Sequence, residues 1–147
     1  MASTRPKPRK LSSAKLRSAA FRRVRADHQS ELAQDYVELI ADLIDERGEA
    51  RGTDVALRLG VANATVVKAL KRLQDQGLVS QEPYRAIFLT GDGWKLAEDG
   101  RRRHKIVERF LLALGVSAET ARIDSEGIEH HVSRETLAAM AKFLTRN

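Results

Sequence analysis

The stretch TDVALRLGVANATVVKALKRLQDQGLVSQEPYRAIFLT, residues 53–90, decides the fold. Its beginning predicts a short helix capped near Thr53 and ended by Gly60, because glycine readily adopts the left-handed conformation that stops a helix. Residues 64–76 predict a second helix with Asn63 as its N-cap. The apolar stripe of this second helix consists of Val66, Val67, Leu70 and Leu73. Two short helices joined by a glycine-containing turn, the second basic on its outer face, are typical of a helix-turn-helix.

The segment after these two helices predicts a β-hairpin. Residues 78–80 and 86–90 have β-prone compositions, and Glu82-Pro-Tyr-Arg85 between them is a turn sequence. A hairpin directly after the second helix is the wing of a winged helix, and its turn places Arg85 to reach a backbone phosphate or the minor groove. Together, the helix pair and the hairpin predict DNA binding.

Helical patterns extend on both sides of this unit. Upstream, apolar residues at spacings of three and four predict a helix from about Phe21 to Arg47, which Gly48 ends. Downstream, the predicted elements are helices over residues 93–114, 117–131 and 133–146, the last two with Ser117 and Ser133 as N-caps. Gly100 falls inside the first of these and is expected to kink or weaken it. The predicted fold class is therefore mostly α.

Charge is unevenly distributed along the chain, whose net charge is +6. Residues 1–26 hold nine basic and no acidic side chains, residues 27–49 carry a net charge of −7, and residues 50–105 carry +5. This pattern suits a nucleic-acid contact in the middle of the chain and a cation site built by its acidic flanks. Residues 1–26 are expected to form a basic tail, disordered or only transiently helical. Two roles stay open for this tail, nonspecific phosphate contacts or solubility alone.

The composition excludes several classes of protein. Cysteine is absent, which rules out disulfides, cysteine-ligated zinc, iron–sulfur clusters and thiol catalysis, so any metal must be held by Asp, Glu, His or backbone oxygen. No apolar run reaches the roughly 18 residues that a membrane span needs. The N-terminus lacks the apolar core of a signal peptide, so we expect a cytoplasmic protein without membrane contact.

Three groups of residues carry metal-ligating side chains. They are Glu126 with Glu129 and His130 at i, i+3 and i+4, Asp35 with Glu38 at i, i+3, and His104 beside an apolar stripe. The first group shares one helical face, on which three ligands can hold one divalent ion. Each group also has an ordinary interpretation, since carboxylate pairs usually form a solvated face and a histidine beside apolar residues is usually packed. Neither His-Glu-x-x-His nor His-x-x-Glu-His occurs, so a metal-dependent enzyme has little support.

Five stretches, taken in order and spacing, resemble a known family. They are Asp35-Tyr-Val-Glu38-Leu-Ile, Val61-Ala-Asn-Ala-Thr-Val-Val-Lys68, Phe88-Leu-Thr90, Arg103-His104 with Phe110-Leu, and Asp124-Ser-Glu-Gly-Ile-Glu-His-His131. On these residues the chain resembles the manganese transport regulators of the diphtheria toxin repressor family, metal-dependent transcription regulators. The resemblance implies a winged helix-turn-helix DNA-binding domain over residues 27–95, followed by an all-helical metal-binding and dimerisation domain over residues 96–147.

The resemblance also implies a ligand set. The family's ligand positions fall on Asp35, Glu38, His104, Glu126, Glu129 and His130. In the manganese branch such a set forms a two-metal cluster, so two Mn²⁺ ions per subunit are expected, with Fe²⁺ as the alternative ion. Iron-type members place softer sulfur ligands where this chain has Asp35 and Glu126, and hard oxygen ligands suit Mn²⁺ better. His131 is expected to lie outside the ligand set.

The expected function is that of a homodimeric, manganese-activated repressor that binds a double-stranded DNA operator and controls manganese transport genes. Apolar residues of the last third are expected to supply the dimer interface together with the domain core; they are Ile106, Phe110, Leu111, Leu114, Leu137, Met140 and Phe143. Three alternatives are an iron-responsive member of the same family, a winged-helix regulator that senses a small organic ligand, and a metalloenzyme. The match at all six ligand positions argues against the organic-ligand regulator, so no organic ligand is expected. A metalloenzyme would need an open coordination site and a general base near a cleft. No such extra group is visible and the chain is short for a substrate pocket, so no enzyme activity is expected.

The contacts with DNA are expected on the second helix of the helix-turn-helix and on the wing. Asn63, Ala64, Thr65 and Lys68 are expected near base edges, because the N-terminal residues of such helices enter the major groove. Lys71, Arg72 and Arg85 are expected at phosphates. For Lys71 and Arg72 an ordinary solvated face fits equally well.

Overall fold

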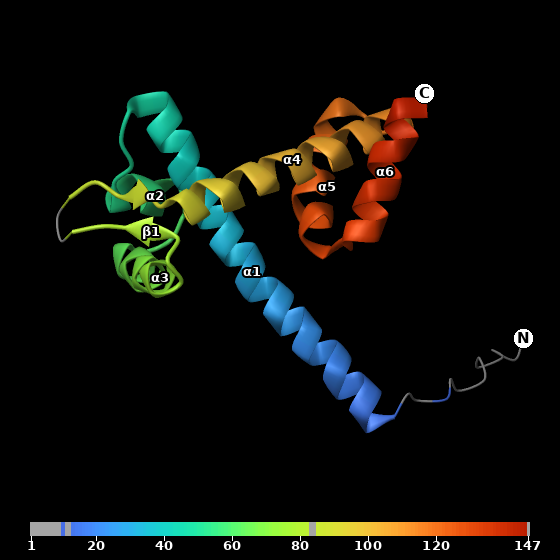
Figure 1. Cartoon of the computed structure of the whole chain (residues 1–147), viewed down its shortest axis with the longest axis horizontal. Coiled ribbons are helices and arrows are strands. Elements are labelled where there is room, and N and C mark those ends of the chain that lie inside the picture. The colour runs from blue at the N-terminus through green and yellow to red at the C-terminus, as the bar shows by residue number, and fades with distance from the viewer. Residues whose placement is uncertain (1–9, 11–12, 83–84, 147) are drawn as a thin grey trace, which may run out of the picture.

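The computed structural model describes Lys10 and residues 13–82 and 85–146 (Figure 1). In chain order the elements are α1 (Ala14–Arg47), α2 (Gly52–Leu59), α3 (Asn63–Asp75), β1 (Val79–Ser80), β2 (Phe88–Leu89), α4 (Gly91–Ala113), α5 (Ala118–His131) and α6 (Arg134–Arg146). A winged helix-turn-helix lies at one end and an all-helical unit at the other, and α4 joins them (Figure 1). The predicted fold class is thereby confirmed.

Helix α1 is longer than predicted. It begins at Ala14 rather than near Phe21, and the Ser13 hydroxyl accepts the Leu16 amide at 3.3 Å and caps it. Residues 14–26 are helical and exposed, which corrects the expected disorder there. Alanine, arginine, leucine and lysine favour the helix in this part and extend it from its packed half. The rest of the expected disordered tail, residues 1–9 and 11–12, lies outside the described residues.

Helices α2 and α3 form the predicted helix-turn-helix, with Gly60 in the left-handed region at φ 68° between them. Two predicted N-caps are wrong. The N-cap positions belong to Arg51 and Ala62, and neither side chain caps its helix. Thr53 and Asn63 lie inside the helices, because the backbone is extended at Arg51 and Ala62 and turns helical directly after them.

Helix α3 buries a narrower stripe than predicted. Val66, Leu70 and Leu73 are buried, whereas the side chain of Val67 is 66% exposed. One residue further along a helix of 3.6 residues per turn lies about 100° around its axis. Val67 therefore turns away from the core and onto the outer face of the helix-turn-helix.

The wing is confirmed as a short antiparallel hairpin. Val79 lies opposite Leu89 and Ser80 opposite Phe88, so the strands are shorter than predicted. Residues 83–84 of the predicted turn lie outside the described residues. The Thr90 hydroxyl donates to the Gly77 carbonyl at 2.6 Å and accepts the Gly93 amide at 3.1 Å, so α4 begins directly from the wing.

One apolar core holds the second half of α1 together with the winged helix. Its largest fully buried side chains are Val37, Ile40, Leu43, Val55, Val66 and Ile87. Burying a side chain of this size contributes roughly 1.5–3 kcal/mol each. Asp35 and Glu38 lie on the same half of α1, so the core fixes these carboxylates relative to α2 and α3.

Helix α4 crosses α1 and continues into the all-helical unit, where α5 and α6 pack against it (Figure 1). The predicted domain border at residues 95 and 96 thus falls inside a continuous helix. Ser117 and Ser133 cap α5 and α6 as predicted, each accepting an amide of the first turn. The rings of Phe110 and Phe143 meet edge to face at 5.4 Å.

The apolar surface of the all-helical unit is incompletely covered by its own chain. Ile106, Phe110, Leu111, Leu137 and Met140 are half-buried, and Leu114 and Phe143 are exposed. Helix α6 buries none of its residues fully although one of its faces is apolar. Such a surface suits contact with a second subunit. No helix in the described ranges is long and apolar enough to cross a membrane.

Candidate metal centre

The six predicted ligands line one cavity of about 720 Å³, bounded by α1, α4 and α5 and by the end of α2. Asp35 and Glu38 come from α1, His104 from α4, and Glu126, Glu129 and His130 from α5. The cavity thus draws residues from the helix that is packed into the DNA-binding unit and from the all-helical unit. Its lining includes two arginines, Arg58 and Arg101, beside carboxylates and imidazoles. Carboxylates and imidazoles are the donor types that hold divalent cations in the absence of cysteine.

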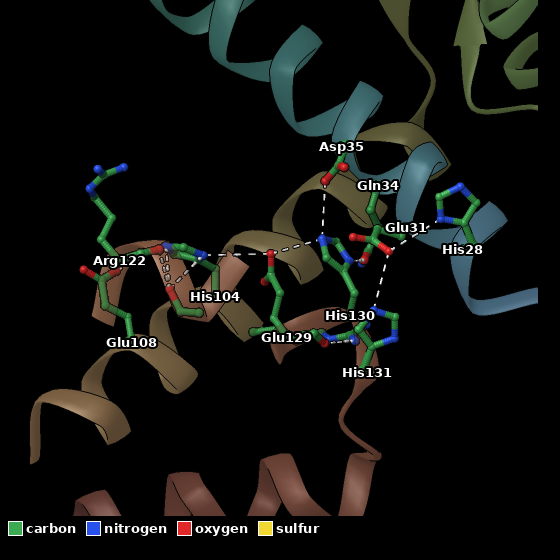
Figure 2. A network of polar contacts seen from close by, with 12 residues as sticks. His28, Glu31, Gln34, Asp35, His104, Glu108, Arg122, Glu129, His130 and His131 are labelled. Atoms are coloured by element: carbon green, nitrogen blue, oxygen red, sulfur yellow. Dashed lines mark hydrogen bonds and ion pairs between the residues drawn. The ribbon is translucent and has the colours of Figure 1, made fainter. Parts of the chain in front are cut away.

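Four of these residues form a continuous chain of polar contacts (Figure 2). His130 Nε2 lies 3.3 Å from Asp35 Oδ1 and 3.5 Å from Glu129 Oε1. Glu129 Oε1 in turn lies 3.9 Å from His104 Nδ1. Glu129 therefore stands between the two imidazoles at the centre of the site, while Glu126 is exposed at its rim.

Two buried carboxylate oxygens in the cavity lack hydrogen-bond partners among the described residues. They are Glu38 Oε1 and Glu129 Oε2. Burial raises the pKa of Glu38 to about 7, with a further contribution from Asp35. Burial, and then Glu38, raise the pKa of Glu129 to about 7. Unsatisfied buried oxygens are costly, and a divalent cation would satisfy both, so these residues fit a metal ion.

His130 is oriented by a residue that the sequence analysis missed. Its Nδ1 lies 2.9 Å from Oε1 of the buried Gln34, and an Nδ1–H that donates there leaves Nε2 to face Asp35 and the cavity. Burial lowers the pKa of His130, but its hydrogen bond to Asp35 and the charges of Asp35, Glu129 and Glu31 together raise the pKa above its ordinary value. The contact of Gln34 with His130 is visible only from the packing of α1 against α5. In the sequence, an amide side chain next to Asp35 does not indicate a role at a metal site.

His104 has its own set of neighbours on the other side of Glu129. Its Nε2 lies 3.2 Å from Glu108 Oε2, and the hydroxyl of the fully buried Ser125 lies 3.5 Å from the ring. The Arg103 side chain donates a hydrogen bond to the backbone carbonyl of Glu129. These contacts tie α4 to α5 at the point where both carry predicted ligands.

A glycine makes room for one of the carboxylates. Gly100 is buried in α4 directly against Glu38, and a Cβ built on it would overlap the Glu38 carboxylate. Helix α4 runs through this residue without a break, so Gly100 does not interrupt the helix. The absence of a side chain at Gly100 instead lets α1 and α4 approach closely enough to bury Glu38.

The predicted DNA contacts all lie on the exposed surface of the winged helix. Asn63, Lys71 and Arg85 line a groove between α3 and the wing, while Thr65, Lys68 and Arg72 line a groove between α3 and α1. Ala64 is exposed at the start of α3. The exposed Val67 also lines the wing-side groove and was missed as a candidate contact, although an apolar side chain there suits a thymine methyl group.

Family models match both parts of the chain. Residues 28–87 match the model described as "Iron dependent repressor, N-terminal DNA binding domain", and residues 90–146 match "Iron dependent repressor, metal binding and dimerisation domain". The chain belongs to the iron-dependent repressor family. The predicted resemblance to metal-dependent regulators of the diphtheria toxin repressor type is thereby confirmed.

Several members of the iron-dependent repressor family are closely similar to this chain. It is 58% identical over 127 residues to the transcriptional regulator MntR of Escherichia coli O6:H1, covering 86% of this chain and 82% of that protein. It is 59% identical over 123 residues to MntR of Salmonella typhimurium, covering 84% of this chain and 78% of that protein.

A solved structure of a manganese-dependent transcriptional repressor in complex with manganese is also similar, with a TM-score of 0.69 and 30% identity. It matches 77% of this chain, which spans about half of that structure, 52% of its length. Because it belongs to the iron-dependent repressor family, the present chain is a DNA-binding transcription regulator with a metal-binding and dimerisation domain. It is not an enzyme, and its partners are DNA and a second copy of itself.

Proposed function

We propose that this protein is a manganese-responsive repressor of manganese transport genes, and that Asp35, Glu38, His104, Glu126, Glu129 and His130 hold the metal. The buried oxygens of Glu38 and Glu129, which no described side chain satisfies, carry the proposal, because a bound cation would satisfy negatively charged oxygens where they lie. All donors are oxygen or nitrogen, which suits Mn²⁺ and disfavours ions that prefer sulfur. The manganese-dependent regulators to which the chain is similar support the same ion.

The proposal includes two Mn²⁺ ions per subunit and a double-stranded operator. Two imidazoles lie on opposite sides of Glu129, and carboxylates surround both, so the donors are spread over two positions rather than gathered at one. A repressor acts on the chromosome, so a cytoplasmic location is part of the proposal. On the operator, Asn63, Ala64, Thr65 and Lys68 lie near base edges, and Lys71, Arg72 and Arg85 lie near phosphates.

The site couples metal to DNA through α1. Its second half is packed into the core of the winged helix, while α5 carries the opposing ligands on the dimerisation side. Without metal, burial raises the pKa of both Glu38 and Glu129, and the nearby Glu38 raises the pKa of Glu129 further, so the ionised carboxylates disfavour this arrangement. A bound divalent cation supplies the positive charge that stabilises the ionised carboxylates.

The residues of the site then hold α1 and α5 together and fix the distance between the two α3 helices of the dimer. Half-sites on B-DNA are about 34 Å apart, so a fixed distance lowers the ordering cost of binding. A coupling of roughly 1–3 kcal/mol is sufficient for such a response.

The direct test is DNA affinity as a function of metal. Chelator-stripped protein would be titrated with Mn²⁺, and in parallel with Fe²⁺ under anoxia, while its binding to a palindromic duplex selected from random DNA is followed. We expect Mn²⁺ to raise the affinity about tenfold or more, and chelator to reverse the effect. Equal affinity without metal would contradict the proposal and favour an organic effector, whereas a response to Fe²⁺ alone would assign the protein to the iron-responsive branch.

Mn²⁺ affinity is expected to increase with pH between about pH 6 and pH 8, because ligands must be deprotonated. The pKa values of Glu38 and Glu129 are raised to about 7, so both carboxyl groups largely hold protons below that value. Protons therefore compete with the metal on the acidic side of this window and cease to do so above it. Calorimetric titrations at several pH values, which also measure proton release, check this; a flat profile would exclude these two carboxylates as ligands.

Lys71→Ala is expected to weaken binding to all DNA sequences equally and to reduce the slope of log affinity against log salt by about 1. Lys71 lies exposed in the groove between α3 and the wing, where a backbone phosphate would lie. Affinities measured at several salt concentrations give the slope. An unchanged slope would assign Lys71 to an ordinary solvated face.

A further inference from the structure

A carboxylate outside the predicted ligand set extends the metal centre along α1. Glu31, Asp35 and Glu38 follow one another at i, i+4 and i+7, which places them on one face of the helix. Glu31 lines the same cavity as the six predicted ligands. One donor atom each from Glu31, Asp35 and His130 lie within 4.8 Å of one another, and no other such group occurs in the described part of the chain.

The present neighbours of Glu31 are two histidines. Its Oε2 lies 3.6 Å from His131 Nε2 and 4.0 Å from His28 Nδ1 (Figure 2). Both histidine side chains are more than half exposed, at 53% and 68%, and exposed ion pairs contribute little. Both partners of the Glu31 carboxylate in these ion pairs are therefore exposed and weakly bound. The carboxylate can exchange them for a stronger partner in the cavity.

The other side of Glu31 faces a much more enclosed environment. The side chain of His130 is only 4% exposed, and its Nε2 lies between Asp35 and the buried Glu129. Glu129 has an unsatisfied oxygen in the same cavity. A cation between Asp35 and His130 would therefore have a carboxylate oxygen of Glu31 close by as an additional donor on α1.

We propose that Glu31 is a seventh ligand of the metal centre and that, with Asp35 and His130, it holds the ion at the α1 end of the cavity. This inference rests on the proposed function, since it assumes that the cavity binds a divalent metal. A third carboxylate on α1 adds a hard oxygen donor to this end of the site. Hard oxygen donors favour Mn²⁺ over ions that prefer nitrogen and sulfur. The third carboxylate also strengthens the link between metal and DNA, because Glu31 is a further ligand on the helix that leads into the winged helix.

The experiment is a Mn²⁺ titration of the chelator-stripped full chain, followed by the electron paramagnetic resonance signal of free Mn²⁺. Three variants would be compared with the wild type. Glu31→Gln removes the charge and one donor, His131→Gln removes the ion-pair partner but leaves the donor, and Glu46→Gln removes an equal charge from α1. Glu46 is 66% exposed and lies outside the cavity lining, so it is the matched control. The same titrations with Zn²⁺ test the ligand preference.

We expect Glu31→Gln to weaken the binding of one Mn²⁺ by about tenfold or more, as the loss of even an outer partner of a metal site does. The loss should be smaller for Zn²⁺, and His131→Gln and Glu46→Gln should bind Mn²⁺ at least as well as the wild type. Unchanged Mn²⁺ affinity in Glu31→Gln would overturn the inference, and so would an equal loss in His131→Gln, which would show that the ion pair is what matters. Failure of the wild type itself to bind Mn²⁺ would overturn the proposed function instead.

Discussion

Glu129→Gln is expected to abolish the Mn²⁺-dependent rise in DNA affinity. Glu129 is only 3% exposed and stands between His130 and His104, at 3.5 and 3.9 Å, so its carboxylate can serve both metal positions. Glutamine keeps the shape of the side chain but replaces one oxygen by an amide group that cannot ligate a cation. We expect Mn²⁺ affinity to fall by about 100-fold and DNA affinity to stay at its metal-free value with or without Mn²⁺.

The same substitution separates a site residue from a residue that merely supports the fold. The raised pKa of Glu129 means that the folded protein keeps a proton that the unfolded chain releases between the ordinary carboxyl value of 4.5 and about 7. The metal-free wild type therefore loses stability as pH rises through this window, and Glu129→Gln should lose less, because only the raised pKa of Glu38 then contributes. Thermal unfolding of the metal-free proteins from about pH 5 to pH 8 measures this difference.

Glu98→Gln is the control for Glu129→Gln, because Glu98 is exposed on α4 and its loss removes the same charge. It should respond to Mn²⁺ like the wild type. A Glu129→Gln protein that is well folded and still activated by Mn²⁺ would remove Glu129 from the site.

Gly100→Ala is expected to damage the metal site while leaving the fold intact. A methyl group at this position would overlap the carboxylate of Glu38, so Glu38 must leave its buried position. Inside a helix, alanine is more favourable than glycine by about 1 kcal/mol, which offsets part of the rearrangement. We expect Mn²⁺ affinity to fall about tenfold or more, with a helix content equal to that of the wild type.

Gly127→Ala is the matched control for Gly100→Ala. Gly127 also lines the cavity and also lies in a helix, but a Cβ there has no neighbour within 4 Å. It should gain the same helix propensity and keep Mn²⁺ binding. Comparison of circular dichroism spectra and Mn²⁺ titrations decides the outcome; wild-type Mn²⁺ affinity in Gly100→Ala would show that Glu38 does not need its present position.

Local sequence determined the elements of this protein because short-range physics determines them. Glycine stops at Gly48 and Gly60, serine caps at Ser117 and Ser133, and the β-prone segments of the wing each act within a few residues, and the structure contains all of them. The preference of certain residues for the N-cap position did not decide where two of the helices begin. Thr53 and Asn63 are good capping residues, yet the helices begin before they can cap them.

Tertiary structure decided what each element does. Val67 is apolar but faces outward, because the angle of α3 against α1 and the wing determines which stripe is buried. Gln34 and Glu31 join the site only because α1 passes beside α5, a contact between segments about a hundred residues apart in the chain. Spacing along one helix shows which side chains share a face, but it does not show what that face meets.

The sequence by itself thus determined the helix-turn-helix, the wing and the types of candidate ligand. Apolar periodicity, turn-forming residues and donor atoms depend only on the residues of each short segment. The approach of α1, α4 and α5 determined the rest: that the six predicted ligands line one cavity, that two buried carboxylate oxygens lack partners among the described residues, and that Gly100 leaves space for Glu38. Burial and close approach arise from many long-range contacts at once, so no single stretch of the sequence encodes them.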